Sequence, residues 1–170
     1  MQQDSKAHIL YVDDEEINLS AFKASFRRDF KIFTALSADA AKVILDENDI
    51  HVLISDQKMP GTPGIELLED ALKKYPHQVR ILLTAYSDFE ILKRAVNNGH
   101  IYKFITKPWD DHALKLSIIE AYDLYLKNKN LRSSIAEVEQ RKIFLEGEIQ
   151  KLEQILKAKK AEIERFIDNG

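Results

Sequence analysis

Five short apolar runs, separated by amphipathic stretches, fill the first two thirds of the chain and limit its possible folds more than any other feature. The runs are at residues 8–12, 31–35, 51–55, 80–85 and 102–106. Most are nearly continuous in apolar residues, which is typical of parallel strands covered on both faces. The stretches with helical spacing between them are at residues 15–28, 38–46, 65–75 and 89–98. Strand and helix therefore alternate along the chain.

This alternation predicts an α/β fold. Ser37 precedes the second helical stretch as a candidate N-cap, and Gly99 follows the fourth, where helices often end. Five strand–helix repeats predict a flavodoxin-like (βα)5 domain, which is a doubly wound parallel sheet with strand order 2-1-3-4-5.

The pattern changes after Pro108. Asp110 or Asp111 can cap a helix there, and no proline follows. Apart from the terminal Gly170, the only later glycine is Gly147. A continuous helix over this segment would be about 85 Å long, at about 1.5 Å per residue. A compact domain cannot bury a helix of that length, so most of the segment is expected to need a partner.

Composition narrows the class of protein. Hydrophobic residues make up 45% of the chain, yet no run approaches the roughly 18 apolar residues of a membrane span. The first six residues lack the apolar centre of a signal peptide, and the absence of cysteine excludes disulfides and thiolate metal sites. The net charge is −3 and no segment concentrates basic residues, so direct binding to nucleic acid or membrane is not expected. We expect a cytoplasmic protein.

Polar residues stand at the ends of the predicted strands. The first strand is followed by Asp13 and Asp14, and the third by Asp56. The fourth ends at Thr84, and the fifth leads into Lys107. Because ligands of an open parallel sheet bind at the carboxyl ends of its strands, we expect three carboxylates, a hydroxyl and an ammonium group at one edge.

These five groups suit phosphoryl transfer. Crowded carboxylates stay ionised when a hard cation lies among them, and Mg²⁺ prefers oxygen ligands. A carboxylate can attack phosphorus to form an acyl phosphate, while a cation and a hydroxyl hold the transferred oxygens. Singly, each residue has an ordinary explanation: a strand-end Asp is more often a cap, Thr84 a β-branched strand residue and Lys107 a solvated side chain. The ordered set is the specific signal.

The sequence from about Ala7 to Leu126 resembles the receiver domain of two-component response regulators. The motifs that carry the resemblance are YVDDE at 11–15, ISDQKMPGTPG at 54–64, LLTAYSD at 82–88 and YKFITKPW at 102–109. The resemblance implies a phosphorelay protein that receives its phosphoryl group from a sensor histidine kinase or a phosphotransfer protein. It implies a signalling module, not an enzyme, that catalyses only its own phosphotransfer and dephosphorylation.

The resemblance also implies roles for individual residues. Asp56 would be the phosphoacceptor, and Thr84 and Lys107 would bind the phosphoryl group. Phe104 would be the switch aromatic that moves with Thr84, although an isolated strand Phe is as often simply buried. The Lys107–Pro108 peptide bond would be cis.

The metal ion implied by the resemblance is Mg²⁺. Its ligands would be Asp14 directly, Asp13 through water, Asp56, and the backbone carbonyl of Lys58. The side chains of Lys58 and Tyr86 flank the site and either tune the lifetime of the acyl phosphate or are merely exposed. The GTPG segment that follows departs from the commoner form with a single glycine, which leaves the conformation of this loop open.

From Leu124 to Phe166 the apolar residues follow a heptad repeat over about six heptads, which predicts a coiled coil. The seam residues are Leu131, Ile135, Val138, Leu145, Ile149, Leu152, Leu156 and Ile163. We therefore expect a receiver domain at 1–126 and, continuous with its last helix, a coiled-coil extension at 127–170 that forms a homodimer. The alternative is an amphipathic helix folded back on the domain, and the length of the segment argues against it.

Polar residues at Asn128, Lys142 and Lys159 interrupt the seam, and such residues can set the register at a cost in stability. The flanking charges are mixed, so parallel and antiparallel pairing both stay open. A parallel dimer would bring the two C-termini together to drive an output domain, which this sequence does not contain. In the resembled family such coils lead to cyclic-di-nucleotide enzymes, phosphatases or kinases.

Two other classes share part of this pattern. A haloacid-dehalogenase-like phosphatase also uses a strand-end Asp, Mg²⁺, a Thr and a Lys, but it needs a second Asp two residues after the nucleophile. Lys58 occupies that position and cannot serve as the acid. A bZIP-like scaffold would use the coil alone, and the basic region that it needs is missing.

Overall fold

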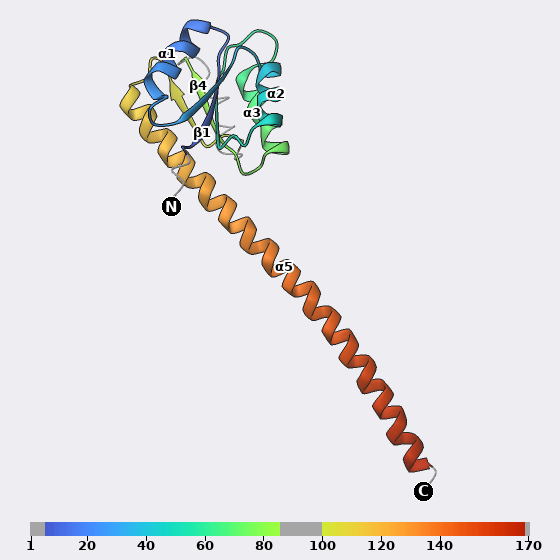
Figure 1. The fold of residues 1–170 in the computed structure, drawn as a ribbon. Helices are drawn as coiled ribbons and strands as arrows, with labels where there is room; N and C mark the ends of the chain where they lie inside the picture. Colours follow the sequence, from blue (N-terminus) through green and yellow to red (C-terminus); the bar gives the residue numbers. More distant parts are fainter. Residues whose placement is uncertain (1–5, 86–99, 169–170) are drawn as a thin grey trace. The chain divides into compact units, whose positions relative to one another are not determined.

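The computed structural model describes residues 6–85 and 100–168 (Figure 1). Its strands are β1 (His8–Val12), β2 (Lys31–Ala35), β3 (Val52–Asp56), β4 (Val79–Thr84) and β5 (Lys103–Thr106). They form one sheet in the order β2-β1-β3-β4-β5, and every neighbouring pair is parallel. The predicted α/β class and strand order are confirmed.

Helices cover both faces of the sheet. They are α1 (Glu16–Phe26), α2 (Ala38–Glu47), α3 (Gly64–Lys74) and α5 (Asp111–Asp168). Helix α1 and the first turns of α5 lie on one face, and α2 and α3 lie on the other (Figure 1). The helix predicted at residues 89–98, together with Tyr86 and Gly99, lies outside the described residues.

Two of the predicted helix caps are present. The Ser37 hydroxyl accepts a hydrogen bond from the backbone N–H of Ala40, which satisfies one of the unpaired donors at the start of α2. At the start of α5, Asp110 and not Asp111 is the cap, since its carboxylate accepts from the N–H of Ala113 at 2.8 Å.

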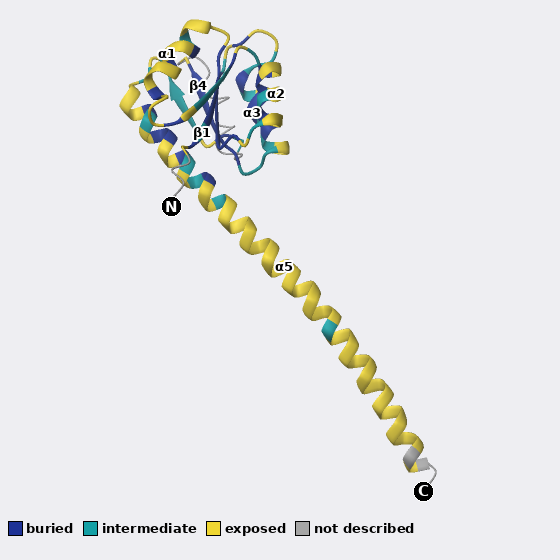
Figure 2. Ribbon diagram, in the orientation of Figure 1, coloured by how far each residue is buried: buried dark blue, intermediate teal, exposed yellow. Residues whose placement is uncertain are grey.

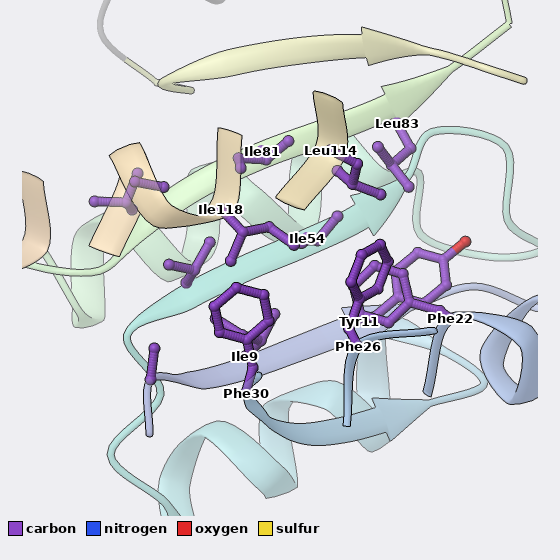
Figure 3. Close-up of a cluster of buried hydrophobic side chains, with 14 of the residues drawn as sticks. Ile9, Tyr11, Phe22, Phe26, Phe30, Ile54, Ile81, Leu83, Leu114 and Ile118 are labelled. Atoms are coloured by element: carbon purple, nitrogen blue, oxygen red, sulfur yellow. The ribbon is translucent and has the colours of Figure 1, made fainter. Parts of the chain in front are cut away.

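Apolar packing on the two faces holds the layers together. The cluster under α1 and α5 includes Ile9, Tyr11 and Phe22 (Figure 3). The cluster under α2 and α3 includes Leu10 and Leu68. Each fully buried side chain of this size contributes about 1.5–3 kcal/mol. Because successive strand residues face opposite sides, the face shared by Ile9 and Tyr11 continues to Asp13.

The register brings the carboxyl ends of the central strands to one edge. Val12 lies opposite Ser55, and Asp56 opposite Leu83. Thr84, the last residue of β4, lies opposite the last residue of β5. The residues that follow these strands are therefore neighbours in space, although they are far apart in sequence.

The predicted long C-terminal helix is confirmed: α5 is a continuous helix of 58 residues. Contacts divide the chain into two compact units, Met1–Asn128 and Lys129–Gly170. In the first unit Leu114, Ile118, Ala121 and Tyr125 form a buried stripe at helical spacing. Among the described residues, no helix is both long and apolar enough to cross a lipid bilayer.

The second unit is a helix whose apolar seam is exposed in the single chain. The eight predicted seam residues, from Leu131 to Ile163, retain 46% to 68% of their accessible surface (Figure 2). Helices in water are stabilised mainly by packing of an apolar face and not by propensity alone. This half of α5 therefore exposes an apolar face of the kind that a partner helix would cover.

Candidate functional site

The ammonium group of Lys107 lies between two buried carboxylates at the carboxyl edge of the sheet. Its Nζ atom is 2.9 Å from Asp13 Oδ2 and also forms an ion pair with Asp56 Oδ1. The side chains of Asp13 and Asp56 are 1% and 9% exposed, and that of Lys107 is 27% exposed. Because unpaired buried carboxylates are costly, the positive charge of Lys107 offsets the burial of both side chains.

The carboxylate of Asp13 is held by four donors. Oδ1 accepts hydrogen bonds from the backbone N–H of Glu15 and from Asn18 Nδ2, each at 3.0 Å. Oδ2 accepts from the Tyr11 hydroxyl at 2.5 Å and from Lys107. A carboxylate has about four lone-pair sites, so every acceptor site of Asp13 is used.

These contacts shift the ionisation of both partners. Burial acts to raise the pKa of Asp13, but the hydrogen bonds from Tyr11, Lys107, Asn18 and the Glu15 N–H together bring it below its ordinary value. For Lys107, burial acts to lower the pKa, and the hydrogen bonds to Asp56 and Asp13 raise it above the ordinary value instead. The pair is therefore charged throughout the neutral pH range.

Asp56 is the last residue of β3, and the backbone after it turns sharply. The N–H of Lys58 donates to Asp56 Oδ2 at 2.7 Å, while the N–H of Gln57 donates to the Leu83 carbonyl of β4. The Lys58 N–H orients the Asp56 carboxylate, which otherwise contacts only Lys107 among the contacts found in the described part of the chain. The Lys58 side chain is exposed.

The loop between β3 and α3 is closed by Gln57 and two glycines. Gln57 accepts from the N–H of Gly64 through its carbonyl and from the N–H of Ile65 through its side chain. Gly61 has a φ of 80°, a conformation that disfavours other residues. A Cβ on Gly64 would lie 2.0 Å from the Asp56 carbonyl oxygen. The backbone conformation at Gly61 and the close contact at Gly64 thus explain why glycine occupies both positions of the GTPG segment.

The remaining predicted residues are near this edge but are not all in contact with the carboxylates. The side chain of Asp14 is exposed. Thr84 is buried, and its hydroxyl donates to the Ala85 carbonyl at 3.0 Å. Phe104 is half-buried and packs against the α2–α3 cluster. The Lys107–Pro108 peptide bond is cis, as predicted.

Within residues 6–85 and 100–168, no group of three or more His, Cys, Asp or Glu side chains is already gathered closely enough to hold a metal ion. Asp13 and Asp56 are instead bridged by Lys107. The chemistry of the donor set still fits Mg²⁺, because carboxylate and backbone oxygens are the ligands available at this edge.

Sequence reasoning missed four residues that shape the site: Tyr11, Asn18, Gln57 and Gly64. Tyr11 and Asp13 are two residues apart on a strand, and such residues share a face, so strand alternation could have indicated their contact. No comparable local signal marks Asn18 or Gln57, whose partners lie on other segments. The unusual GTPG segment contains Gly64 but does not indicate its close approach to Asp56.

Fold and site together define a class of protein: a doubly wound α/β domain with a buried aspartate–lysine site at the carboxyl edge of its sheet. The family model of the response regulator receiver domain matches residues 9–119. The chain therefore belongs to the response regulator receiver family. This membership favours the receiver over the phosphatase and bZIP-like alternatives.

Several characterised proteins are similar to this chain. The hydrogenase transcriptional regulatory protein HoxA of Cupriavidus necator is 34% identical over 145 residues, which cover 81% of this chain and 30% of HoxA. A cyclic di-GMP phosphodiesterase of Thermotoga maritima is 33% identical over 141 residues, which cover 81% of this chain and 36% of that protein. The chain thus spans about a third of the length of these relatives.

Solved structures show the same fold. A response regulator receiver domain protein from Clostridium thermocellum has 31% sequence identity and a TM-score of 0.67, covering 74% of this chain and 98% of that one. The receiver domain of an HD domain-containing protein from Pseudomonas fluorescens has 28% identity and a TM-score of 0.70, covering 76% and 96%.

Proposed function

We propose that the chain is a two-component response regulator that accepts a phosphoryl group on Asp56 from a sensor histidine kinase or a phosphotransfer protein. The observation that carries the proposal is the position of Lys107, which pairs with both Asp13 and Asp56 at the carboxyl edge of the sheet. A cation held against an otherwise lightly bonded carboxylate is what an incoming phosphoryl group requires.

In the transfer step, a carboxylate oxygen of Asp56 attacks phosphorus. The bond from phosphorus to the donor's histidine nitrogen breaks as the bond to Asp56 forms, and the histidine retains the electron pair. The Lys58 N–H holds one oxygen of Asp56 while the other attacks. Lys107 is then free to exchange its contact with Asp56, whose charge has moved outward, for an oxygen of the phosphoryl group.

Mg²⁺ is the cofactor of this proposal, and when bound it would offset the negative charge of the carboxylates and the phosphoryl oxygens. The residues that would hold it are Asp14, Asp56 and the Lys58 carbonyl, with Asp13 as an outer ligand through a water that would replace one of its present donors. Asp14 is exposed and so is available to a cation from solvent.

The output of the site is a change in the C-terminal helix. Thr84 would redirect its hydroxyl from the Ala85 carbonyl to the phosphoryl group, and Phe104 would follow it inward. The receiver domain, residues 1–126, would then act on the coiled-coil extension, residues 127–170. Homodimeric pairing of this extension would relay the signal to an output domain outside the sequence, within the cytoplasm.

The proposal is tested by treating the protein with acetyl phosphate and Mg²⁺ and recording the intact mass. We expect the addition of one phosphoryl group in the native protein and none in Asp56→Asn, because an amide cannot form the acyl phosphate. Asp46→Asn is a matched control, since Asp46 is also a lysine-paired carboxylate but lies far from the site. Equal phosphorylation of Asp56→Asn and the native protein would rule out Asp56 as the acceptor.

A further inference from the structure

Tyr11 connects the hydrophobic core to the phosphorylation site. Its ring is fully buried, with its centroid 4.4 Å from that of Phe22 and an edge-to-face contact with Trp109 at 6.3 Å. Figure 3 shows the Tyr11 and Phe22 rings side by side in the cluster under α1 and α5. The hydroxyl reaches out of this cluster to Asp13 Oδ2 at 2.5 Å.

The Tyr11 hydroxyl shares its acceptor atom with Lys107. Asp13 Oδ2 receives both the hydroxyl and Lys107 Nζ, while the other oxygen is occupied by Glu15 N–H and Asn18. Each donor withdraws negative charge from the carboxylate. A hydrogen bond from a buried hydroxyl to a carboxylate is strengthened because the surrounding core provides little dielectric screening.

We propose that Tyr11 acts on the site through Asp13. Its hydroxyl reduces the negative charge that Asp13 presents at the sheet edge, and this weakens the binding of Mg²⁺ before phosphorylation. This inference rests on the proposed function, because it assumes that Mg²⁺ binds beside Asp13. Its consequence is that Asp13 attracts Mg²⁺ less strongly than it would without the Tyr11 hydroxyl.

A purely structural role for Tyr11 predicts the opposite change. If the hydroxyl served only to orient Asp13, its removal would loosen the carboxylate and weaken Mg²⁺ binding, as loss of an outer-shell partner usually does. Three other donors to Asp13 remain when the hydroxyl is removed, so its orientation should persist. What changes is its charge, and the sign of the change in Mg²⁺ affinity separates the two roles.

The test compares Tyr11→Phe with the native protein in titrations with MgCl₂ alone, followed by the amide NMR signals of Asp14 and Lys58. We expect the Kd for Mg²⁺ to fall about three- to tenfold, a fraction of what a hydrogen bond to a charged group contributes. Tyr125→Phe is the matched control, because Tyr125 is also buried and its hydroxyl donates to a carboxylate, Asp49, that precedes β3 at the opposite edge. Its Kd should equal the native value.

An unchanged or higher Kd in Tyr11→Phe would overturn the inference. Asn18→Ala, which removes a donor from the half-buried side of the same carboxylate, should lower the Kd in the same direction but less, since water can replace the amide. If Tyr11→Phe did not fold, an unchanged Kd in Asn18→Ala would count equally against the inference. Absence of Mg²⁺ binding in the native protein would instead contradict the Mg²⁺ part of the proposed function.

Discussion

Adjacent residues at the end of β1 have different surroundings. Asp13 is buried and accepts four hydrogen bonds, whereas Asp14 is exposed. Asp13 therefore contributes to the stability of the fold, whereas Asp14 can bind a ligand with little effect on that stability. The two are indistinguishable in the DD motif itself.

Substitutions of Asp13 and Asp14 should distinguish a residue that stabilises the fold from one that binds the metal ion. Asp13→Asn places an amide NH₂ against existing donors, and we expect it to lower the free energy of unfolding by about 3 kcal/mol, the usual cost of breaking a buried ion pair. Asp14→Ala should change that free energy by less than about 0.5 kcal/mol while weakening Mg²⁺ binding. Urea denaturation without metal gives both values. A large loss in Asp14→Ala would make Asp14 structural.

Lys107 should link stability to pH. Asp13, with its lowered pKa, stabilises the fold above about pH 4 and loses this effect as pH falls through its folded pKa. Lys107, with its raised pKa, stabilises the fold below about pH 10.4 and loses this effect as pH rises through its folded pKa. The contribution of this pair should therefore be constant between about pH 5 and pH 9.

Lys107→Met should remove the stabilising contribution of this ion pair. At pH 7 we expect a loss of about 2 kcal/mol, below the range for fully buried pairs because Lys107 is partly exposed. The loss should shrink toward pH 4.5, because protonation of a carboxylate removes the uncompensated charge. Lys73→Met is the control, since its ion pair with Asp70 is exposed and should contribute almost nothing. Urea unfolding at both pH values measures the difference, and a loss independent of pH would argue against the charge explanation.

At the scale of elements, the loop from β3 to α3 and the helix α5 place the functional groups. Close approach of α3 to β3 requires a residue without a side chain at Gly64, where a Cβ would meet the Asp56 backbone. The start of α3 is therefore packed directly against Asp56, the proposed phosphoacceptor, and a change at this point should reach the site.

Gly64→Ala should be more harmful than Gly61→Ala. The first introduces a clash with backbone atoms that cannot move without shifting β3 or α3, and we expect a loss of more than about 2 kcal/mol. The second introduces only a strained φ with open space around the Cβ, for which about 1 kcal/mol is expected. Thermal or urea unfolding compares the variants. The reverse order would mean that the glycine conformation outweighs the close contact.

Pairing of α5 should depend on the predicted seam and not on exposed apolar residues in general. Ile149 belongs to the seam and Ile143 does not, yet both are exposed in the single chain. We expect Ile149→Asp to convert a dimer to monomers at about 20 µM, because one seam charge on each chain would be buried against the other. Ile143→Asp should leave the mass from light scattering unchanged. Equal effects would contradict a seam through Ile149.

At the scale of the whole molecule, the chain consists of a compact unit, Met1–Asn128, and a second unit, Lys129–Gly170, that share one helix. The first unit contains both apolar clusters and all residues of the proposed site. The second contributes no buried apolar residue among those described. We therefore expect that phosphorylation of the first unit and dimerisation through the second unit can be separated.

A chain that ends at Asn128 should fold, accept a phosphoryl group from acetyl phosphate and lose the strong dimer. Its stability should match that of the longer chain under conditions where the latter is monomeric, because no core residue is removed.

In the full chain, beryllofluoride should change the distance between spin labels at Glu146 of the two copies. An unchanged distance would argue against signal relay through the coil, and a dimeric truncated chain would place the interface elsewhere.

Much of this molecule follows from patterns within short stretches of sequence. Apolar runs and helical spacing indicated the strands and the long α5, because burial on two faces or on one face leaves a periodic trace, and the strand order was expected from the doubly wound fold that such alternation predicts. Knowledge that ligands bind at strand ends then placed Asp13, Asp56, Thr84 and Lys107 at one edge. The positions of the strands, the helices and the strand-end residues can be inferred from the pattern of nearby residues and the direction of the chain.

Tertiary structure alone decided which atoms meet at that edge. Lys107 and Asp13 are 94 residues apart, and their contact depends on how β5 packs beside β4 and on how β3 separates β4 from β1. The hydrogen bond of Tyr11 and the close fit of Gly64 depend in the same way on the positions of other segments. Sequence periodicity records that a side chain is buried, but not against which group, because many distant residues produce the same apolar or polar pattern.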